Sequence, residues 1–135
     1  MLSSVESLSQ LVNPSDPGWV AIVDDEAPVR EALLDLLDEA GFPACAFASG
    51  EEFLQSERRY ECACLITDIR MPGISGLDLQ ARLHAARLRI PIIFITAHGD
   101  ERMRTEALRA GAVEFLAKPF DDEVLVETVR AALER

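Results

Sequence analysis

Five side chains that could do chemistry follow or close short apolar segments of the sequence. Three are carboxylates, one is a hydroxyl and one is an amine; they are Asp24, Asp25, Asp68, Thr96 and Lys118. If the apolar segments are parallel strands of one sheet, their carboxyl ends meet at the same edge. We therefore expect these five side chains, which are far apart in the sequence, to converge there.

Three carboxylates at one sheet edge need a compensating charge. Two like charges about 4 Å apart repel by roughly 4 kcal/mol at an effective dielectric constant of ~20. A proton, a cation or both must offset that repulsion. Mg²⁺ fits best, because it binds one or two carboxylates and keeps positions open for water and phosphate oxygens.

The remaining two residues suit phosphoryl transfer. Lys118 supplies a movable point charge, and Thr96 supplies a hydroxyl that can donate a hydrogen bond. In phosphoryl transfer the protein mainly positions groups and stabilises charge on the transferring oxygens. A carboxylate such as that of Asp68 can itself be the nucleophile and carry the phosphoryl group as an acyl phosphate.

The elements that must position these residues follow from the hydrophobic pattern. Apolar runs predict strands at 19–23, 44–47, 62–67, 91–96 and 112–117. Helical spacing and capping signals predict a helix from Pro28 to Ala40 and a short helix that begins with a capping box at 49–52 and runs through Leu54. Further helices are predicted at 77–88, 100–110 and 121–133. Strands without polar alternation indicate a parallel sheet covered on both faces, and right-handed crossovers then give a doubly wound sheet. We expect an α/β fold of (βα)5 flavodoxin-like type with strand order 2-1-3-4-5.

Composition excludes several classes of protein. The chain has 135 residues, enough for one domain, with 24 acidic and 13 basic residues and a net charge of −11. That charge argues against nucleic-acid or anionic-membrane binding, and no apolar run is long enough to span a membrane. There is no secretory signal, and three cysteines are too few for a disulfide scaffold, so a cytoplasmic protein is expected. We interpret Cys62 and Cys64 as buried packing residues.

The N-terminal segment differs from the rest of the chain. Residues 1–18 contain no basic residue and several helix breakers, although Leu2, Val5, Leu8 and Leu11 recur every three residues. We expect a leader at 1–18 that is flexible or forms a short helix, and a domain at 19–135.

Four stretches of the sequence resemble the receiver domain of bacterial two-component response regulators. They are Ile-Val-Asp-Asp-Glu (22–26), Thr-Asp-Ile-Arg-Met-Pro-Gly-Ile-Ser-Gly (67–76), Ile-Thr-Ala-His-Gly-Asp (95–100) and Gly-Ala-Val-Glu-Phe-Leu-Ala-Lys-Pro-Phe (111–120). The resemblance covers about residues 19–135. The last three stretches look most like the FixJ-like branch, whose full-length members carry a DNA-binding output domain.

The resemblance implies a phosphorylation-dependent signalling switch. Asp68 matches the residue that accepts a phosphoryl group from a sensor histidine kinase or a phosphotransfer protein. Asp24, Asp25 and Asp68 match the carboxylates that hold Mg²⁺, with the backbone carbonyl of Arg70 as a further ligand. Lys118 matches the ion-pairing lysine. Such a domain catalyses its own phosphorylation and slow dephosphorylation and is not a turnover enzyme.

The resemblance also implies how the switch would work. Thr96 matches a hydroxyl that bonds the phosphoryl oxygen, and Phe115 matches an aromatic residue that turns inward when Thr96 moves. Pro119 follows a peptide bond that is cis in the family. Arg70 and His98 lie near the site and either modulate access of water to the phosphorylated aspartate or are ordinary surface residues.

A partner surface is expected around residues 100–135. Its charged residues are Arg102, Arg104, Arg109, Asp121, Asp122 and Glu123. These residues either form an ordinary solvated face or, as the resemblance implies, a phosphorylation-dependent homodimer surface. The sequence leaves open the cognate kinase, the output and whether the receiver stands alone.

Two other functions compete with the switch. One is a small Mg²⁺-dependent phosphatase with an aspartate nucleophile, but such enzymes generally place an acid two residues after the nucleophile, where this chain has Arg70. The other is a nucleotide or flavin binder, but the loop after the first strand is acidic and lacks the glycines that cradle a phosphate.

Overall fold

The five apolar segments form one parallel sheet, as the sequence predicts. In the computed structural model the strands are β1 (Trp19–Val23), β2 (Ala44–Phe47), β3 (Cys62–Thr67), β4 (Ile92–Thr96) and β5 (Glu114–Ala117). Their order is β2-β1-β3-β4-β5, and every neighbouring pair is parallel. The predicted strand order is confirmed, so all strand carboxyl ends lie at one edge of the sheet.

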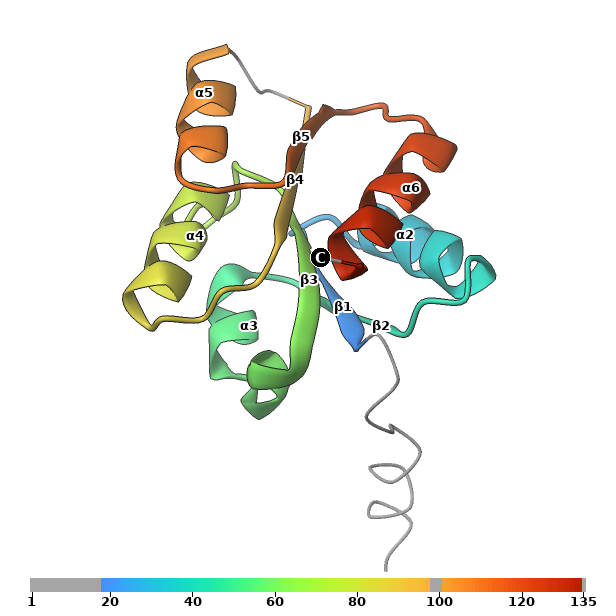
Figure 1. Cartoon of the computed structure of the whole chain (residues 1–135), viewed down its shortest axis with the longest axis horizontal. Helices are drawn as coiled ribbons and strands as arrows, with labels where there is room; N and C mark the ends of the chain where they lie inside the picture. Colours follow the sequence, from blue (N-terminus) through green and yellow to red (C-terminus); the bar gives the residue numbers. More distant parts are fainter. Residues whose placement is uncertain (1–17, 98–100, 135) are drawn as a thin grey trace, which may run out of the picture.

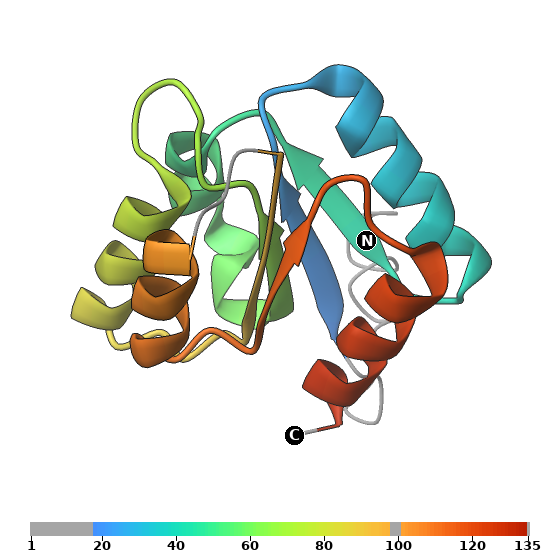
Figure 2. The same ribbon diagram turned by 90° about the horizontal axis from the view of Figure 1, so that it is seen from above.

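Helices cover both faces of this sheet. They are α2 (Ala27–Glu39), α3 (Gly50–Gln55), α4 (Gly76–Ala85), α5 (Glu101–Arg109) and α6 (Asp122–Leu133), with a short 3₁₀ helix, η1 (Glu57–Glu61), that was not predicted. Figure 1 shows α2 and α6 on one face and α3, α4 and α5 on the other. The two helical layers are also separated by the sheet in the view from above (Figure 2).

The structure describes residues 18–97 and 101–134. The predictions for most of the leader, for His98 and for the first residue of the helix at 100–110 lie outside the described residues. Within the described part, no helix is long and apolar enough to cross a membrane.

The strands are apolar throughout because both of their faces are covered. On one face Ile22 of β1 belongs to a buried cluster that also contains Leu33 and Leu37 of α2 and Val129 of α6. On the other face Phe53 of α3 belongs to a second cluster that also contains side chains of α4 and α5. Each burial removes apolar surface from water at roughly 25 cal/mol per Å². Two cores of this kind fix the sheet and leave its carboxyl edge free for polar groups.

Helix α4 ends at Ala85, three residues before the predicted boundary at Leu88. Arg87 has a positive φ of 61°. The Arg87 N–H donates to the His84 carbonyl and the Leu88 N–H donates to the Leu83 carbonyl, both at 2.9 Å. This is a Schellman-type end, which usually employs glycine. The prediction of a longer helix was wrong because no glycine marks the turn.

The capping signals are borne out in part. The Ser49 side chain accepts from the Glu52 N–H at 3.1 Å and begins α3. The Glu52 carboxylate accepts from the N–H of Ala48 at 3.3 Å, so the reciprocal bond begins one residue earlier than a capping box requires. A complete capping box, which the sequence interpretation missed, begins α4 with Ser75 and Asp78.

Gly76 lets α4 start directly against the end of β3. Its N–H donates to the Ile69 carbonyl at 2.8 Å. A Cβ at this position would overlap the carbonyl oxygen of Asp68 and press on Ile69 and the ring of Phe94. The absence of a side chain therefore sets how closely α4 approaches the backbone that carries Asp68.

We expect Gly76→Ala to destabilise the fold by about 1–3 kcal/mol, because the added methyl group must displace backbone. Thermal unfolding of the two proteins measures this. In an unobstructed helix the same substitution would stabilise by about 0.4–1 kcal/mol. A melting temperature above that of the wild type would therefore contradict the close approach.

Candidate functional site

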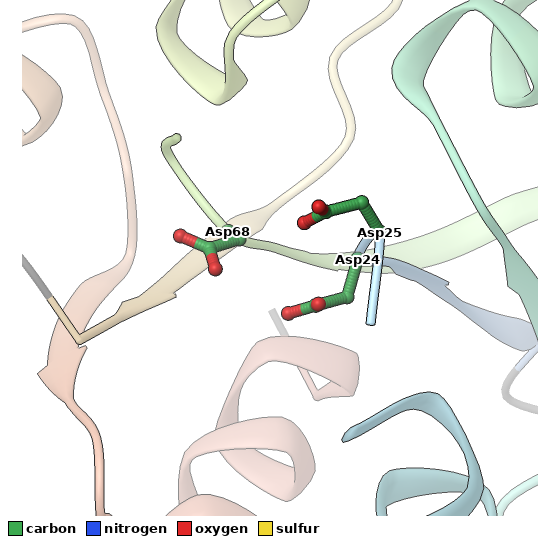
Figure 3. A group of neighbouring side chains, drawn as sticks. All are labelled: Asp24, Asp25 and Asp68. Carbon is green, nitrogen blue, oxygen red and sulfur yellow. The ribbon is translucent and has the colours of Figure 1, made fainter. Parts of the chain in front are cut away.

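Three carboxylates gather at the carboxyl edge of the sheet. Figure 3 shows Asp24 and Asp25 after β1 and Asp68 after β3. One oxygen from each lies within 4.8 Å of the others. Asp24 and Asp68 are buried, with exposed fractions of 0% and 6%, whereas Asp25 is exposed. A set of carboxylate oxygens open to solvent on one side fits a hard divalent cation such as Mg²⁺.

Lys118, just after β5, bridges the two buried carboxylates. Its Nζ lies 3.0 Å from Oδ2 of Asp24 and 2.9 Å from Oδ2 of Asp68. Glu26 adds a weaker contact, with its Oε1 3.8 Å from the same Nζ. The ammonium group offsets part of the repulsion between the aspartates and leaves the cluster with a net negative charge.

Burial and pairing act on these groups in opposite directions. Burial raises the pKa of Asp24, although the Glu26 N–H and the Lys118 ammonium both donate to its carboxylate and oppose the rise. Burial lowers the pKa of Lys118, but its hydrogen bonds to Asp68 and Asp24 outweigh burial and the pKa is raised. The lysine is therefore firmly charged, while the charge on Asp24 costs free energy in the folded state.

The backbone after β3 holds the other oxygen of Asp68. The Ile69 N–H donates to Asp68 Oδ1 at 2.6 Å, and the Arg70 N–H donates to it at 3.3 Å. Lys118 holds Oδ2. The Arg70 side chain is exposed beside the site. Hydrogen-bond donors to both oxygens therefore fix the orientation of the Asp68 carboxylate.

Strands β4 and β5 bring the remaining predicted residues to the same edge. Thr96 ends β4, is 2% exposed, and its carbonyl accepts the N–H of Lys118 at 2.9 Å. Phe115 in β5 is half-buried, with its ring 6.4 Å from that of Phe94. The Lys118–Pro119 peptide bond is cis. Every predicted site residue except His98 falls in the described part of the chain; Phe115 lies within β5, and the others lie at or just after the carboxyl ends of their strands.

Two residues at the site were missed by sequence reasoning. Glu26 donates its N–H to Asp24 Oδ1 at 2.9 Å and approaches Lys118 with its side chain. Arg30 in α2 donates from Nη1 to the carbonyl of Asp24 at 2.7 Å. The signal for Glu26 is its place directly after two aspartates. Arg30 could have been noticed in the sequence because it places a cation at the start of a predicted helix, where the helix dipole disfavours a positive charge.

Comparison with known proteins places these features in a family. The family model of the response regulator receiver domain matches residues 20–130. Nodulation protein W of Bradyrhizobium diazoefficiens is 46% identical over 116 residues, which are 86% of this chain and 51% of that protein. The transcriptional regulatory protein FixJ of Rhizobium meliloti is 44% identical over 115 residues, 85% of this chain and 56% of its own length. The chain thus spans about half the length of these curated relatives.

The fold agrees with a solved structure. The crystal structure of FixJ-N superposes with a TM-score of 0.80 and 43% sequence identity, covering 87% of this chain and 94% of that one. The flavodoxin-like arrangement of the described strands and helices is therefore the one that this relative has.

We expect Asp24→Asn to stabilise the protein at pH 7 without divalent cations, by on the order of 1 kcal/mol. The substitution removes a buried charge and its repulsion from Asp68, while Lys118 keeps Asp68 as a partner. Chemical denaturation in the presence of a chelator measures the free energy of unfolding.

The pH dependence fixes the sign of this effect. Because the folded pKa of Asp24 lies above 3.8, the wild type loses stability as the pH rises from there through the folded pKa. The asparagine variant has no such proton to lose, so its advantage grows from low pH to pH 7. Asp35→Asn, an exposed carboxylate on α2, is the matched control and should change little. An Asp24→Asn variant less stable than the wild type at pH 7 would refute this account.

Proposed function

The chain belongs to the response regulator receiver family, in its FixJ-like branch, and we propose from this that phosphorylation of Asp68 switches one of its partner surfaces. The observation that carries the proposal is the environment of that one carboxylate. Amide N–H groups hold one oxygen, Lys118 holds the other, and the carboxylates of Asp24 and Asp25 lie beside it. Receiver domains act as phosphorylation-dependent switches of two-component systems.

In the proposed reaction an oxygen of Asp68 forms a bond to phosphorus. The bond from phosphorus to the leaving group breaks, whether that group is the imidazole of a kinase phosphohistidine or the acetate of acetyl phosphate. Lys118, already 2.9 Å from Asp68, neutralises part of the charge on the incoming phosphoryl oxygens. The product is an acyl phosphate on Asp68.

A divalent cation fits beside Asp68. Asp24, Asp25, Asp68 and the backbone carbonyl of Arg70 would hold Mg²⁺, because these groups supply only oxygen ligands. When bound, Mg²⁺ supplies positive charge against the phosphoryl oxygens. The residues of the chain orient the nucleophile, Asp68, and hold its carboxylate between amide and ammonium donors.

Phosphorylation would reach the surface through the ends of β4 and β5. Thr96 would donate its hydroxyl to the phosphoryl group, and Phe115, which is half-buried beside Phe94, would pack further inward. The backbone bond from Lys118 to Thr96 couples the two strand ends. Arg70 and His98 would modulate access of water to the phosphorylated Asp68.

The partner surface would lie along the edge strand β5. Helices α5 and α6 lie on opposite faces of the sheet, so they share a surface only where both border β5 (Figure 1). The charged residues predicted for this surface are exposed, namely Arg102, Arg104, Arg109, Asp121, Asp122 and Glu123. A sensor histidine kinase or a phosphotransfer protein would be the phosphoryl donor, and a second copy of the chain a partner after phosphorylation.

A Mg²⁺-dependent phosphatase is the competing function. The position two residues after Asp68 holds Arg70, whose guanidinium group cannot act as a general acid at neutral pH. Arg70 at this position favours an aspartate that accepts and retains a phosphoryl group. It disfavours an enzyme that hydrolyses phosphate esters repeatedly.

We expect wild-type protein treated with acetyl phosphate and Mg²⁺ to gain one phosphoryl group, and Asp68→Asn to gain none, because the amide is not a nucleophile. Intact-mass spectrometry measures the adduct. Asp122→Asn, an exposed acid at the start of α6, is the control and should be phosphorylated as the wild type is. A wild-type protein without an adduct contradicts the proposal, and sustained hydrolysis of a phosphomonoester would favour the phosphatase.

We expect Lys118→Arg to leave phosphorylation of Asp68 measurable while weakening the conformational response. The net charge is unchanged, but a planar guanidinium group cannot place one compact charge about 3 Å from both Asp24 and Asp68. Intact mass gives the phosphorylated fraction, and amide NMR shifts at Phe115 give the response. Full shifts at equal phosphorylation would show that the compact ammonium group is not required.

A further inference from the structure

The guanidinium group of Arg30 contacts the backbone between two of the candidate metal ligands. Its Nη1 donates to the carbonyl oxygen of Asp24 at 2.7 Å. That distance is typical of a strong hydrogen bond from a charged donor. Arg30 is half-buried, and its own N–H is used within the helix, donating to the Glu26 carbonyl at 3.1 Å.

The place of Arg30 in α2 is locally unfavourable. It is the fourth residue of the helix, and the first turn of α2 contains no acidic residue. The positive end of the helix dipole lies there, so a cation costs roughly 0.3–1 kcal/mol. A residue that breaks a local rule calls for a compensating gain elsewhere. Among residues 18–97 and 101–134, the hydrogen bond from Arg30 to the Asp24 carbonyl at the end of β1 can supply that gain.

That bond fixes a peptide unit and not only one oxygen. The peptide group is planar, so the carbonyl of Asp24 and the N–H of Asp25 turn together. Holding the carbonyl therefore limits the directions in which the side chains of both residues can leave the backbone. Asp24 is also held by Glu26 and Lys118, whereas in the described part of the chain no hydrogen bond or ion pair fixes the carboxylate of Asp25. The orientation of Asp25 thus depends on its backbone.

We propose that Arg30 is a positioning residue that aligns Asp24 and Asp25 for a divalent cation. The inference rests on the proposed function, since it assigns a role toward the same Mg²⁺. Charge alone predicts the opposite effect, because a guanidinium group near the cluster repels a cation. The sign of the change on removing Arg30 therefore separates positioning from simple electrostatics.

The test is a calorimetric titration of the full chain with Mg²⁺, combined with thermal unfolding of the metal-free protein. Arg30→Gln should bind Mg²⁺ about tenfold more weakly than the wild type, a typical cost of losing a group that orients metal ligands. Arg30→Lys keeps a charged donor and should recover most of the affinity. Arg82→Gln, which removes an exposed arginine on α4, is the matched control and should bind as the wild type does.

Each outcome decides a different question. Equal or tighter binding by Arg30→Gln would overturn the positioning role, as would a lower melting temperature with unchanged affinity. A wild type that does not bind Mg²⁺ would remove the proposed function itself. A second measurement uses the wild type and so does not require any variant to fold. The guanidinium NMR signals of Arg30 should shift when Mg²⁺ is added, while those of Arg82 should not. Unshifted Arg30 signals would also overturn the inference.

Discussion

The ammonium group of Lys118 holds carboxylates that follow two other strands, and the candidate site depends on this contact. Asp24 and Asp68 end neighbouring strands, whereas Lys118 comes from β5, two strands away from β3. Neighbouring strands lie about 4.8 Å apart, so only a long side chain reaches across the end of β4. The bond from the Lys118 N–H to Thr96 turns the chain toward the cluster. The strand order thus places Lys118 within reach of both carboxylates, and its long side chain spans the remaining distance.

The fold could be predicted because its determinants are local and repeated. Five apolar runs separated by amphipathic segments indicate a covered parallel sheet, and the right-handed crossover rule makes that sheet doubly wound. The end of α4 could not be predicted, because Arg87 adopts a conformation usually taken by glycine. Asp24, Asp68 and Lys118 could be predicted as a cluster because strand ends converge. The contact of Arg30 could not, since a cation at the start of a helix does not reveal which carbonyl its side chain reaches.

The site and the fold make opposite demands at Asp24. A buried carboxylate with a raised pKa lowers the stability of the domain. The apolar cores on the two faces, around Leu37 and Phe53, supply the stability that permits this. A protein that tolerates such a cluster at one edge keeps the free energy of its repulsion available for binding a cation or a phosphoryl group.

Lys118 is also the only lysine among the 135 residues, the other 12 basic residues being arginines. Acylating reagents therefore find one side-chain amine in this chain, and it lies between Asp24 and Asp68. Acylation of that amine would abolish its charge, and the cluster would lose the cation that bridges its two buried carboxylates. Acylation of this one side chain, read separately from the α-amino group, thus becomes a chemical readout of how tightly the site is closed.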